Sequence, residues 1–365
     1  MCPVRPTDSA PSDAGDHDVR LMMRAIALAA AVRTKTSPNP WVGTVVVPGP
    51  TSPAEGAPDG AADPEIVFEG ATSPPGGPHA EVAALSAAGD RARGSTLYTT
   101  LEPCSHHGRT PPCTDAIVAA GVSRVVVGLL DPDPAVDGRG VEALRHAGIE
   151  VAVGAAAPEV EEQLAAYLTH RRTGRPLVVL KLAATMDGRI AAPDGSSRWI
   201  TGPDSRRDAH ELRRMSDAVL VGAGTVRSDD PELTVRNEPI PERQPLRVVL
   251  GRAEAGSRVL PAVELSGDPE SVLDELGGRG ILQLLVEGGA RVAAAFHGAR
   301  VVDRYVLYFA PALFGGDDAV PLFAGPGAPT IEQLWRGRVV SVERLGDDVR
   351  MELAPDRREP TNRAA

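Results

Sequence analysis

Four residues in the first half of this chain constrain it most: His79, Glu81, Cys104 and Cys113. The pattern predicts that His79 and Cys113 each open a helix after a proline, and that Cys104 follows a strand. One imidazole and two thiolates give Zn²⁺ three protein ligands and leave its fourth position for water, as in catalytic zinc sites. Helix N-termini also favour thiolates, because the positive end of the helix dipole stabilises their charge. The set therefore predicts a zinc site with an open position.

Glu81 is a candidate proton-transfer group for this site. It lies two residues after His79, on the first turn of the same predicted helix, where it can reach a water on the metal without being a ligand. A carboxylate there takes a proton from the water and hands it to departing ammonia. His-x-Glu followed by Pro-Cys and a second Cys is the pattern of zinc deaminases.

The spacing of the two cysteines is unusual for such an enzyme. Eight residues separate Cys104 from Cys113, where zinc deaminases usually have two. By spacing alone, the alternative is a structural zinc site, which usually closes with a fourth protein ligand, here His106 or His107. A structural site gives Glu81 no role, and the two readings stay open at this point.

The bulk properties limit the class of protein. A length of 365 residues favours two domains, and a net charge of −11 with 3% aromatic residues argues against nucleic acid as a partner. The third cysteine, Cys2, lies in a polar leader, so no disulfide framework is expected. The leader has no apolar core, and the alanine-rich run 25–32 is too short to span a bilayer. We expect a cytoplasmic protein without membrane partners.

Strand and helix patterns alternate in both halves, which predicts α/β layers with mostly parallel strands. In the first half, helices are expected from Leu21 to about Arg33 and at 81–88, 114–120, 140–147 and 159–169, with strands at 42–47, 96–101, 124–129 and 149–153. In the second half, strands are expected at 177–183, 218–221, 247–250, 282–286, 305–309 and 349–353, with helices at 204–214 and 291–296. A charged turn with glycine and proline, 171–176, marks the boundary. We predict a disordered leader (1–17), two domains (18–172 and 176–355), a frayed tail (356–365) and a long loop (48–64).

The stretch between the two cysteines resembles one family closely. Residues 103–113 read PCSHHGRTPPC, and they match the bifunctional deaminase–reductases of riboflavin biosynthesis. Other strings of the same family follow in order over roughly residues 20–350. They are TSPNP (36–40), PHAE (78–81), DPDP (131–134), GRG (138–140), KLAATMDGR (181–189), WITG (199–202), VGAGTVRSDDPELTVR (221–236) and VEGG (286–289).

The resemblance implies a fold and two reactions. The first half resembles a cytidine-deaminase-like three-layer α/β domain, which would use zinc to remove an amino group from a phosphorylated diaminopyrimidine. Asn39 would help to orient the pyrimidine, although its residue type also fits a plain turn before Pro40. The second half resembles dihydrofolate reductase in fold, and it would reduce the ribose of the deaminated product with NADPH. Small phosphorylated pyrimidines are thus the expected partners, and we expect a homo-oligomer, a dimer or tetramer.

The second half offers two glycine-containing turns that can approach phosphate through backbone N–H groups. Gly288 and Gly289 stand between a strand and a helix and form the stronger candidate; the turn at 222–225 is weaker and lacks the full dinucleotide-binding spacing. The resemblance places Ala183, Trp199, Thr225 and Asp229 at cofactor positions, and Ser197, Arg213, Leu233, Arg236 and Glu287 at substrate positions. Asp229 would lie near the nicotinamide and help proton transfer. Arg213 and Arg236 would hold the substrate phosphate, because guanidinium binds phosphate through paired hydrogen bonds.

The sequence departs from the family pattern in three places. The usual Gly-x-Gly-x-His string is here Phe68–Thr72, the loop 48–64 is long, and Gly251-Arg252 stands where Asp-Ser is usual. The last change makes an impaired reductase an alternative. Two others are a nucleic-acid base deaminase and a zinc-stabilised scaffold without catalysis, which the acidic charge and Glu81 respectively disfavour.

Overall fold

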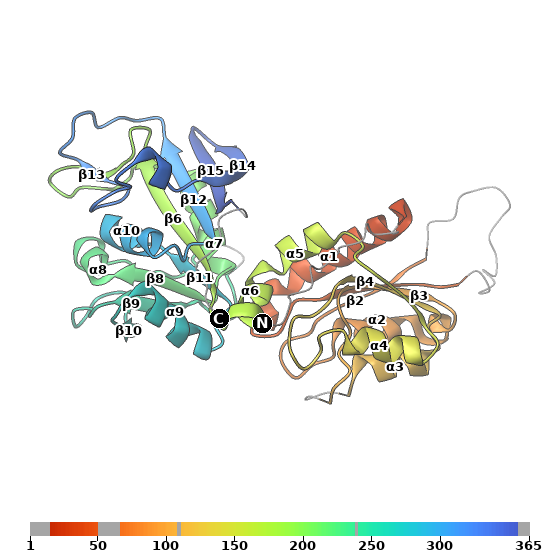
Figure 1. Ribbon diagram of the computed structural model, residues 1–365. Coiled ribbons are helices and arrows are strands. Elements are labelled where there is room, and N and C mark those ends of the chain that lie inside the picture. The colour runs from red at the N-terminus through yellow and green to blue at the C-terminus, as the bar shows by residue number, and fades with distance from the viewer. Residues whose placement is uncertain (1–14, 50–65, 108–110, 238–239, 357–365) are drawn as a thin grey trace, which may run out of the picture. The chain divides into compact units, whose positions relative to one another are not determined.

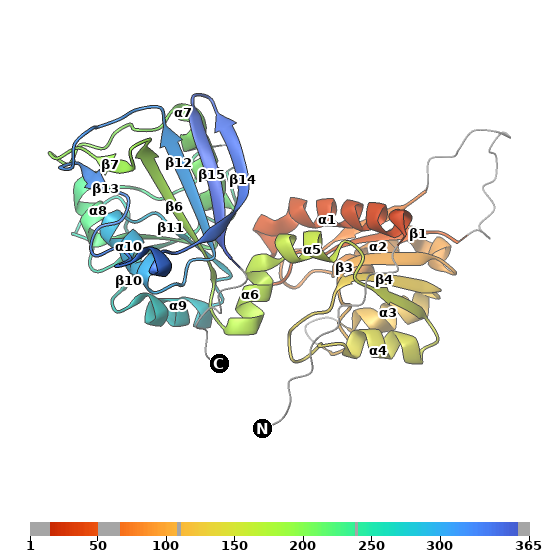
Figure 2. The ribbon, with the colours of Figure 1, turned by 45° about the horizontal axis from the view of Figure 1, so that its top comes forward.

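The computed structural model describes residues 15–49, 66–107, 111–237 and 240–356, and the chain divides into two units, residues 1–172 and 173–365. Each unit is an α/β structure with its own sheet (Figures 1 and 2). The predicted fold class is confirmed.

Unit 1 contains a five-stranded sheet in the order β2-β1-β3-β4-β5. The pairs β2/β1 and β1/β3 are antiparallel, whereas β3, β4 and β5 run parallel. The strands are β1 (Gly43–Val47), β2 (Phe68–Ala71), β3 (Thr96–Leu101), β4 (Arg124–Leu129) and β5 (Glu150–Val153). The helices are α1 (Asp16–Thr36), α2 (Ala80–Ala88), α3 (Cys113–Ala120), α4 (Arg139–His146), α5 (Ala157–Gln163) and α6 (Ala165–Thr173), with a 3₁₀ turn at Gly89–Ala92.

Helices cover both faces of this sheet. Figure 1 shows α1 and α5 on one face and α2, α3 and α4 on the other. Helices pack on both faces of β1, β3 and β4. These strands are therefore nearly continuous runs of buried residues, many of them β-branched. Gly43 lets α1 approach the sheet closely, since a Cβ there would lie 1.9 Å from the carbonyl oxygen of Ala25. This three-layer arrangement brings the starts of α2 and α3 close to the end of β3.

Unit 2 contains an eight-stranded sheet in the order β10-β9-β8-β11-β6-β12-β15-β14. Its strands are parallel from β10 to β12, and β15 and β14 complete it antiparallel. These strands are β6 (Leu177–Thr185), β8 (Ala218–Gly222), β9 (Leu246–Leu250), β10 (Val263–Leu265), β11 (Gln283–Val286), β12 (Arg304–Ala310), β14 (Gly337–Leu345) and β15 (Asp348–Pro355). A separate ribbon pairs β7 (Arg189–Ala191) with β13 (Val320–Pro321).

The helices of unit 2 are α7 (Pro203–Arg214), α8 (Ala223–Asp229), α9 (Pro269–Gly278) and α10 (Ala290–Gly298), with a 3₁₀ turn at Ile331–Gln333. Apolar side chains of α9 and α10 join those of β6, β8 and β11 in one core. Asp208 of α7 accepts a hydrogen bond from Tyr308 of β12, and Tyr305, three residues earlier on the same strand, belongs to that core. Because successive side chains of a strand alternate in direction, α7 lies on the opposite face.

Several expected boundaries need correction. Helix α1 begins at Asp16, so the last two residues of the expected leader are helical, while residues 1–14 lie outside the described residues. The same holds for residues 50–65 of the expected loop and 357–365 of the expected tail. The helix expected at 159–169 is interrupted at Leu164, which separates α5 from α6. The expectation of mostly parallel strands fits unit 2 better than unit 1, where two of four strand pairs are antiparallel.

Candidate functional site

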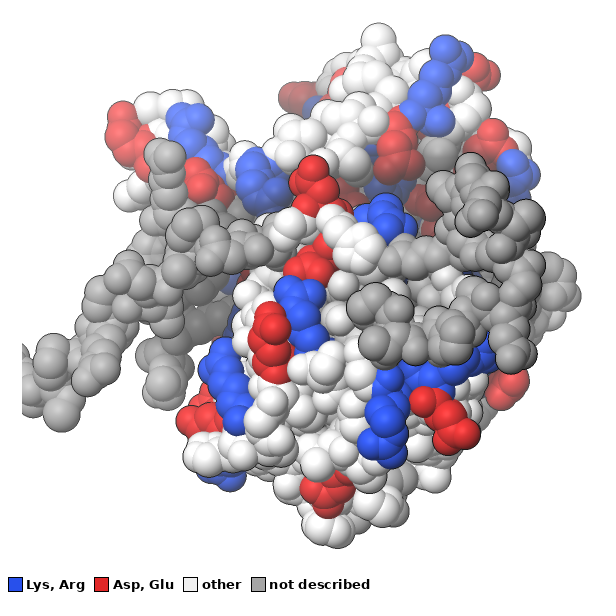
Figure 3. Space-filling model, turned by 90° about the vertical axis from the view of Figure 1, so that its right-hand side faces the viewer, with Lys and Arg blue, Asp and Glu red and all other residues white. Residues whose placement is uncertain are grey.

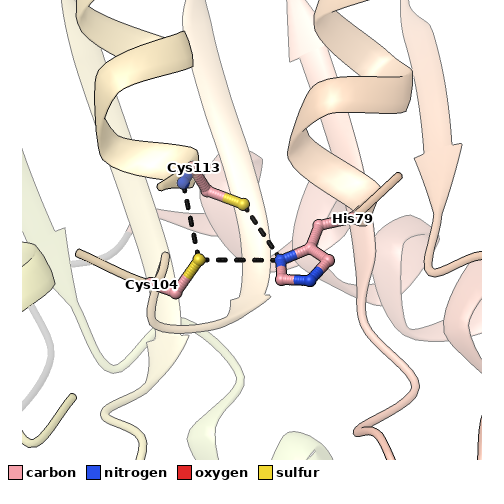
Figure 4. Close-up of side chains that lie close together, drawn as sticks. All are labelled: His79, Cys104 and Cys113. Atoms are coloured by element: carbon pink, nitrogen blue, oxygen red, sulfur yellow. Dashed lines mark hydrogen bonds between the residues drawn. The ribbon is translucent and has the colours of Figure 1, made fainter. Parts of the chain in front are cut away.

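The structure brings His79, Cys104 and Cys113 together at one place in unit 1 (Figure 4). His79 caps the start of α2, Cys113 is the first residue of α3, and Cys104 lies just beyond β3. The Nδ1 atom of His79 is 3.2 Å from Sγ of Cys113 and 3.6 Å from Sγ of Cys104. Their ligand atoms all lie within 4.8 Å of one another.

These distances fit a zinc ion. Zn–S and Zn–N bonds of about 2.3 and 2.05 Å at a tetrahedral angle separate nitrogen from sulfur by about 3.6 Å. No other cluster of three or more such side chains occurs among the residues that the structure describes. His106 and His107, the alternative fourth ligands of a structural site, are outside this cluster and exposed. The three residues therefore fit a site that keeps one position open.

Hydrogen bonds make the two thiols differ in how readily they lose a proton. The hydrogen bond between the two side chains lowers the pKa of the Cys104 thiol and raises that of Cys113. The backbone N–H of Cys113, at the start of α3, also points to Sγ of Cys104 at 3.4 Å. The hydrogen bond with Cys104 raises the pKa of His79 as well. The helix start thus favours a thiolate at Cys104, as zinc binding requires.

Glu81 is buried beside these three residues, with 4% of its surface exposed. It lies in the first turn of α2, two residues beyond His79. Burial raises the pKa of its carboxyl to about 7, and the group hydrogen-bonds with the Cys113 thiol. A carboxyl buried without a salt bridge is costly, which is typical of groups retained for chemistry.

Two sequence features near this site have structural explanations. Asn39 lies in the turn after α1, half-buried, and its backbone N–H donates to the Thr36 carbonyl at 2.9 Å. Thr72 ends the string Phe68–Thr72, one of the three departures noted in the sequence. It is buried, and its hydroxyl oxygen accepts from the N–H of Val42 at 3.0 Å, so it extends the pairing of β1 and β2.

In unit 2, the structure brings together two of the predicted substrate residues. Arg213 of α7 and Glu287, just after β11, form a buried bidentate ion pair with N–O distances of 2.5 and 2.9 Å. Lys181 of β6 lies 4.0 Å from the same carboxylate. Burial raises the pKa of Glu287, but the charges of Arg213 and Lys181 outweigh that effect, and the net shift is downward.

Sequence reasoning missed Lys181 as a member of this cluster. The signal was available, since lysine stands at only two positions of a chain that otherwise uses arginine. Burial lowers the pKa of Lys181, and the Glu287 carboxylate partly offsets this.

The other predicted substrate residues lie in loops. Arg236 is half-exposed and pairs with Glu232 at 2.7 Å. Leu233 is buried, with a left-handed φ of 55°. Ser197 is half-buried between β7 and α7.

Three of the six predicted cofactor residues, Thr225, Gly288 and Gly289, lie around two helix starts. Gly222 ends β8 and precedes α8, and Gly289 precedes α10. The backbone N–H of Gly289 donates to Oγ1 of Thr225 at 3.3 Å, which links the two turns. A side chain at Gly288 would lie 2.4 Å from Cβ of Val292, so glycine is required there for close packing of α10.

The remaining three cofactor residues are spread over unit 2. Ala183 lies in β6, and Asp229 ends α8, where its carbonyl accepts a hydrogen bond from Arg198. Trp199 is 70% exposed, and the guanidinium of Arg206 lies 4.7 Å from its ring centroid.

Comparisons with known proteins match one family model to each of the two units. The family model for the cytidine and deoxycytidylate deaminase zinc-binding region matches residues 16–129, and the model for the RibD C-terminal domain matches residues 176–351. The chain is 41% identical to riboflavin biosynthesis protein RibD of Aquifex aeolicus, over 91% of this chain and 97% of that protein. It is 39% identical to RibD of Escherichia coli, over 92% and 99%.

Solved structures give the same result over almost the whole chain. The structure of Acinetobacter baumannii RibD, form 1, is similar with a TM-score of 0.84 and 36% identity, covering 93% of this chain and 99% of that one. A deaminase/reductase from Thermotoga maritima matches with a TM-score of 0.81 and 36% identity, with the same coverage. That enzyme is described as a diaminohydroxyphosphoribosylaminopyrimidine deaminase and 5-amino-6-(5-phosphoribosylamino)uracil reductase.

Proposed function

The chain belongs to the RibD family of riboflavin biosynthesis proteins, and from this premise we propose the substrates and the residues of its two reactions. It is a bifunctional enzyme with a zinc-dependent deaminase domain and an NADPH-dependent reductase domain. Unit 1 would deaminate 2,5-diamino-6-ribosylamino-4(3H)-pyrimidinone 5′-phosphate. Unit 2 would then reduce the ribose to give 5-amino-6-(5-phosphoribitylamino)uracil.

The observation that carries the deaminase assignment is the open three-ligand cluster with Glu81 buried beside it. His79, Cys104 and Cys113 would hold the zinc ion, which when bound lowers the pKa of water and supplies a nucleophile near neutral pH. Glu81 would accept the proton of that water and return it to the departing amino group. Its burial excludes bulk water from the proton path. Asn39, in the turn after α1, would orient the pyrimidine.

In unit 2, the bound NADPH supplies the hydride. Gly288 and Gly289, before α10, would approach its phosphates, and Ala183, Trp199, Thr225 and Asp229 would contact the rest of it. Asp229 would also assist proton transfer at the ribose. Ser197, Leu233 and Glu287 would bind the substrate. Both proposed phosphate ligands are paired with carboxylates, Arg213 with Glu287 and Arg236 with Glu232, and Arg236 is the more exposed of the two.

The test of this proposal follows two signals on the purified full-length chain. We expect ammonia release from the diamino substrate, and NADPH oxidation when the deaminated substrate is supplied. Ammonia release without any NADPH oxidation would support the impaired-reductase alternative instead. Neither signal, with zinc bound, would support a scaffold.

Small molecules remain our proposed partners, without nucleic acid. On the surface in view in Figure 3, Lys and Arg side chains alternate with Asp and Glu over the described residues, instead of forming one basic patch. No described helix is long and apolar enough to cross a membrane. We propose a cytoplasmic location, because the two cysteines must stay reduced to bind zinc.

We also infer that the chain forms a homo-oligomer, and β14 is the segment that supports this. It is an edge strand of the large sheet, beside β15 (Figure 2). Val339 and Val342 are 58% and 57% exposed on it. Antiparallel pairing of β14 with its copy in a second chain would set Val339 opposite Val342 and Arg338 opposite Glu343.

Light scattering with size-exclusion chromatography tests this interface. We expect a dimer or tetramer, and Val342→Lys should shift it toward the monomer, because a charged side chain on an edge strand would lie opposite an apolar valine and oppose pairing. Val118→Lys, at an exposed site on α3, is the control. A monomeric wild-type chain would contradict the inference.

A further inference from the structure

Glu102 is a buried carboxylate that the deaminase mechanism above does not use. It follows β3 directly, stands two residues before Cys104 and is 4% exposed. Within the residues that the structure describes, no cation pairs with it, and four backbone N–H groups donate to it instead. They belong to Asp131 (3.2 Å), Gly138 (2.9 Å), Gly140 (2.8 Å) and Val141 (3.1 Å).

These four donors come from one continuous segment, the loop after β4 and the first turn of α4. Gly138 caps α4 without a side-chain hydrogen bond of its own, so the orphan N–H groups of that helix start are satisfied by Glu102. A negative charge at this end is also favoured by the helix dipole. Glu102 thus fastens the start of α4 to the end of β3, across 38 positions of sequence.

The fastening acts on the backbone that leads to a zinc ligand. A Cβ on Gly140 would lie 2.0 Å from the carbonyl oxygen of Pro103, so the first turn of α4 is packed against the residue before Cys104. On the other side, the Cys104 carbonyl accepts from the N–H of Thr114, in α3. The Cys104 segment is therefore held between the starts of two helices, and Glu102 fixes one of them.

We propose that Glu102 is a positioning residue of the deaminase site: its carboxylate, bound to four backbone N–H groups, holds Cys104 at the distance from His79 and Cys113 that zinc binding needs. It does not touch metal or substrate in this role. Mutation of groups that orient metal ligands in other proteins typically lowers metal affinity or activity about 10- to 100-fold. The proposal rests on the zinc site proposed above.

The test is a zinc competition titration against a chromophoric chelator with the full-length chain. Glu102→Gln keeps the size of the side chain but turns one of its two acceptors into a donor that faces N–H groups. We expect its zinc dissociation constant to rise about 10- to 100-fold. Glu142→Gln, an exposed glutamate on α4, is the matched control and should bind zinc as the wild type does.

A second measurement separates positioning from simple stabilisation. Cobalt(II) bound in place of zinc reports the geometry of its thiolate ligands through its absorption spectrum. We expect Glu102→Gln to change this spectrum, and Gly140→Ala, which pushes α4 away from Pro103, to change it in the same way. Wild-type affinity and an unchanged cobalt spectrum in Glu102→Gln would overturn the inference. Failure of the wild-type chain to bind zinc would instead overturn the zinc site itself.

Discussion

Replacing Glu287 with glutamine should lower the melting temperature of unit 2 by about 6–20 °C. In the native structure, Glu287 and Arg213 form a bidentate pair with side chains only 8% and 14% exposed, and Lys181 lies 4.0 Å away. The variant leaves two buried cations facing an uncharged amide. Breaking a buried pair in this way costs about 3–5 kcal/mol. Each kcal/mol shifts the melting temperature by about 2–4 °C in a domain of this size.

Differential scanning calorimetry is the suitable assay, because two units need not unfold in one transition. Only the transition of unit 2 should move. Glu232→Gln is the control: its pairs with Arg236 and Arg258 lie at the surface, where solvent screens them, so its loss should move the transition little. The double variant Glu287→Gln/Arg213→Met should recover part of the loss, since one unpaired cation is removed. A shift below about 2 °C for Glu287→Gln would refute the reasoning, because the pair would then contribute no more than a surface pair.

Three further predictions concern single residues. Glu81→Gln should keep zinc, as measured by metal analysis, and lose about 10²- to 10⁴-fold in the rate of ammonia release; a fully active variant would remove Glu81 from the mechanism. Unit 1 should lose stability as the pH falls below about 4, because a hydrogen bond from Arg124 holds the pKa of Asp18 below its usual value and that stabilisation is lost on protonation. In Asp18→Asn the melting temperature should depend less on pH in this range, and an unchanged dependence would contradict the assignment. Gly288→Ala should weaken NADPH binding in a fluorescence titration, because its Cβ would overlap a side chain of α10, whereas Gly298→Ala, with open space around it, should not.

The zinc cluster could be predicted from the sequence because its geometry follows from local features. His79 and Cys113 each stand at a helix start marked by proline, and Cys104 follows a strand of almost entirely buried residues. The ligand types, one imidazole and two thiolates, then indicate zinc as the metal. The family resemblance, carried by longer strings in order, is also confirmed.

Contacts between distant segments could not be predicted in the same way. Arg213 and Glu287 are 74 residues apart, and nothing in either neighbourhood indicates that they pair. The four N–H donors to Glu102 could not be predicted either, because the residue types in a sequence do not show which backbone groups will donate. Strands β10 and β14 were missed: β10 has only three residues, and β14 is mostly exposed and lacks the continuous apolar runs of the central strands. Helix α8 was read as a turn, because Gly222 and Gly224 lie at its start.

The central claim is that one chain carries two activities in series, at two separate sites. The most direct measurement is NADPH oxidation by Glu81→Gln, with each of the two substrates supplied in turn. With the diamino substrate we predict oxidation slowed by about 10²- to 10⁴-fold, because deamination limits it, and with the deaminated substrate we predict a wild-type rate. Oxidation at the wild-type rate with the diamino substrate would contradict the account, because reduction would then not depend on the zinc site of unit 1.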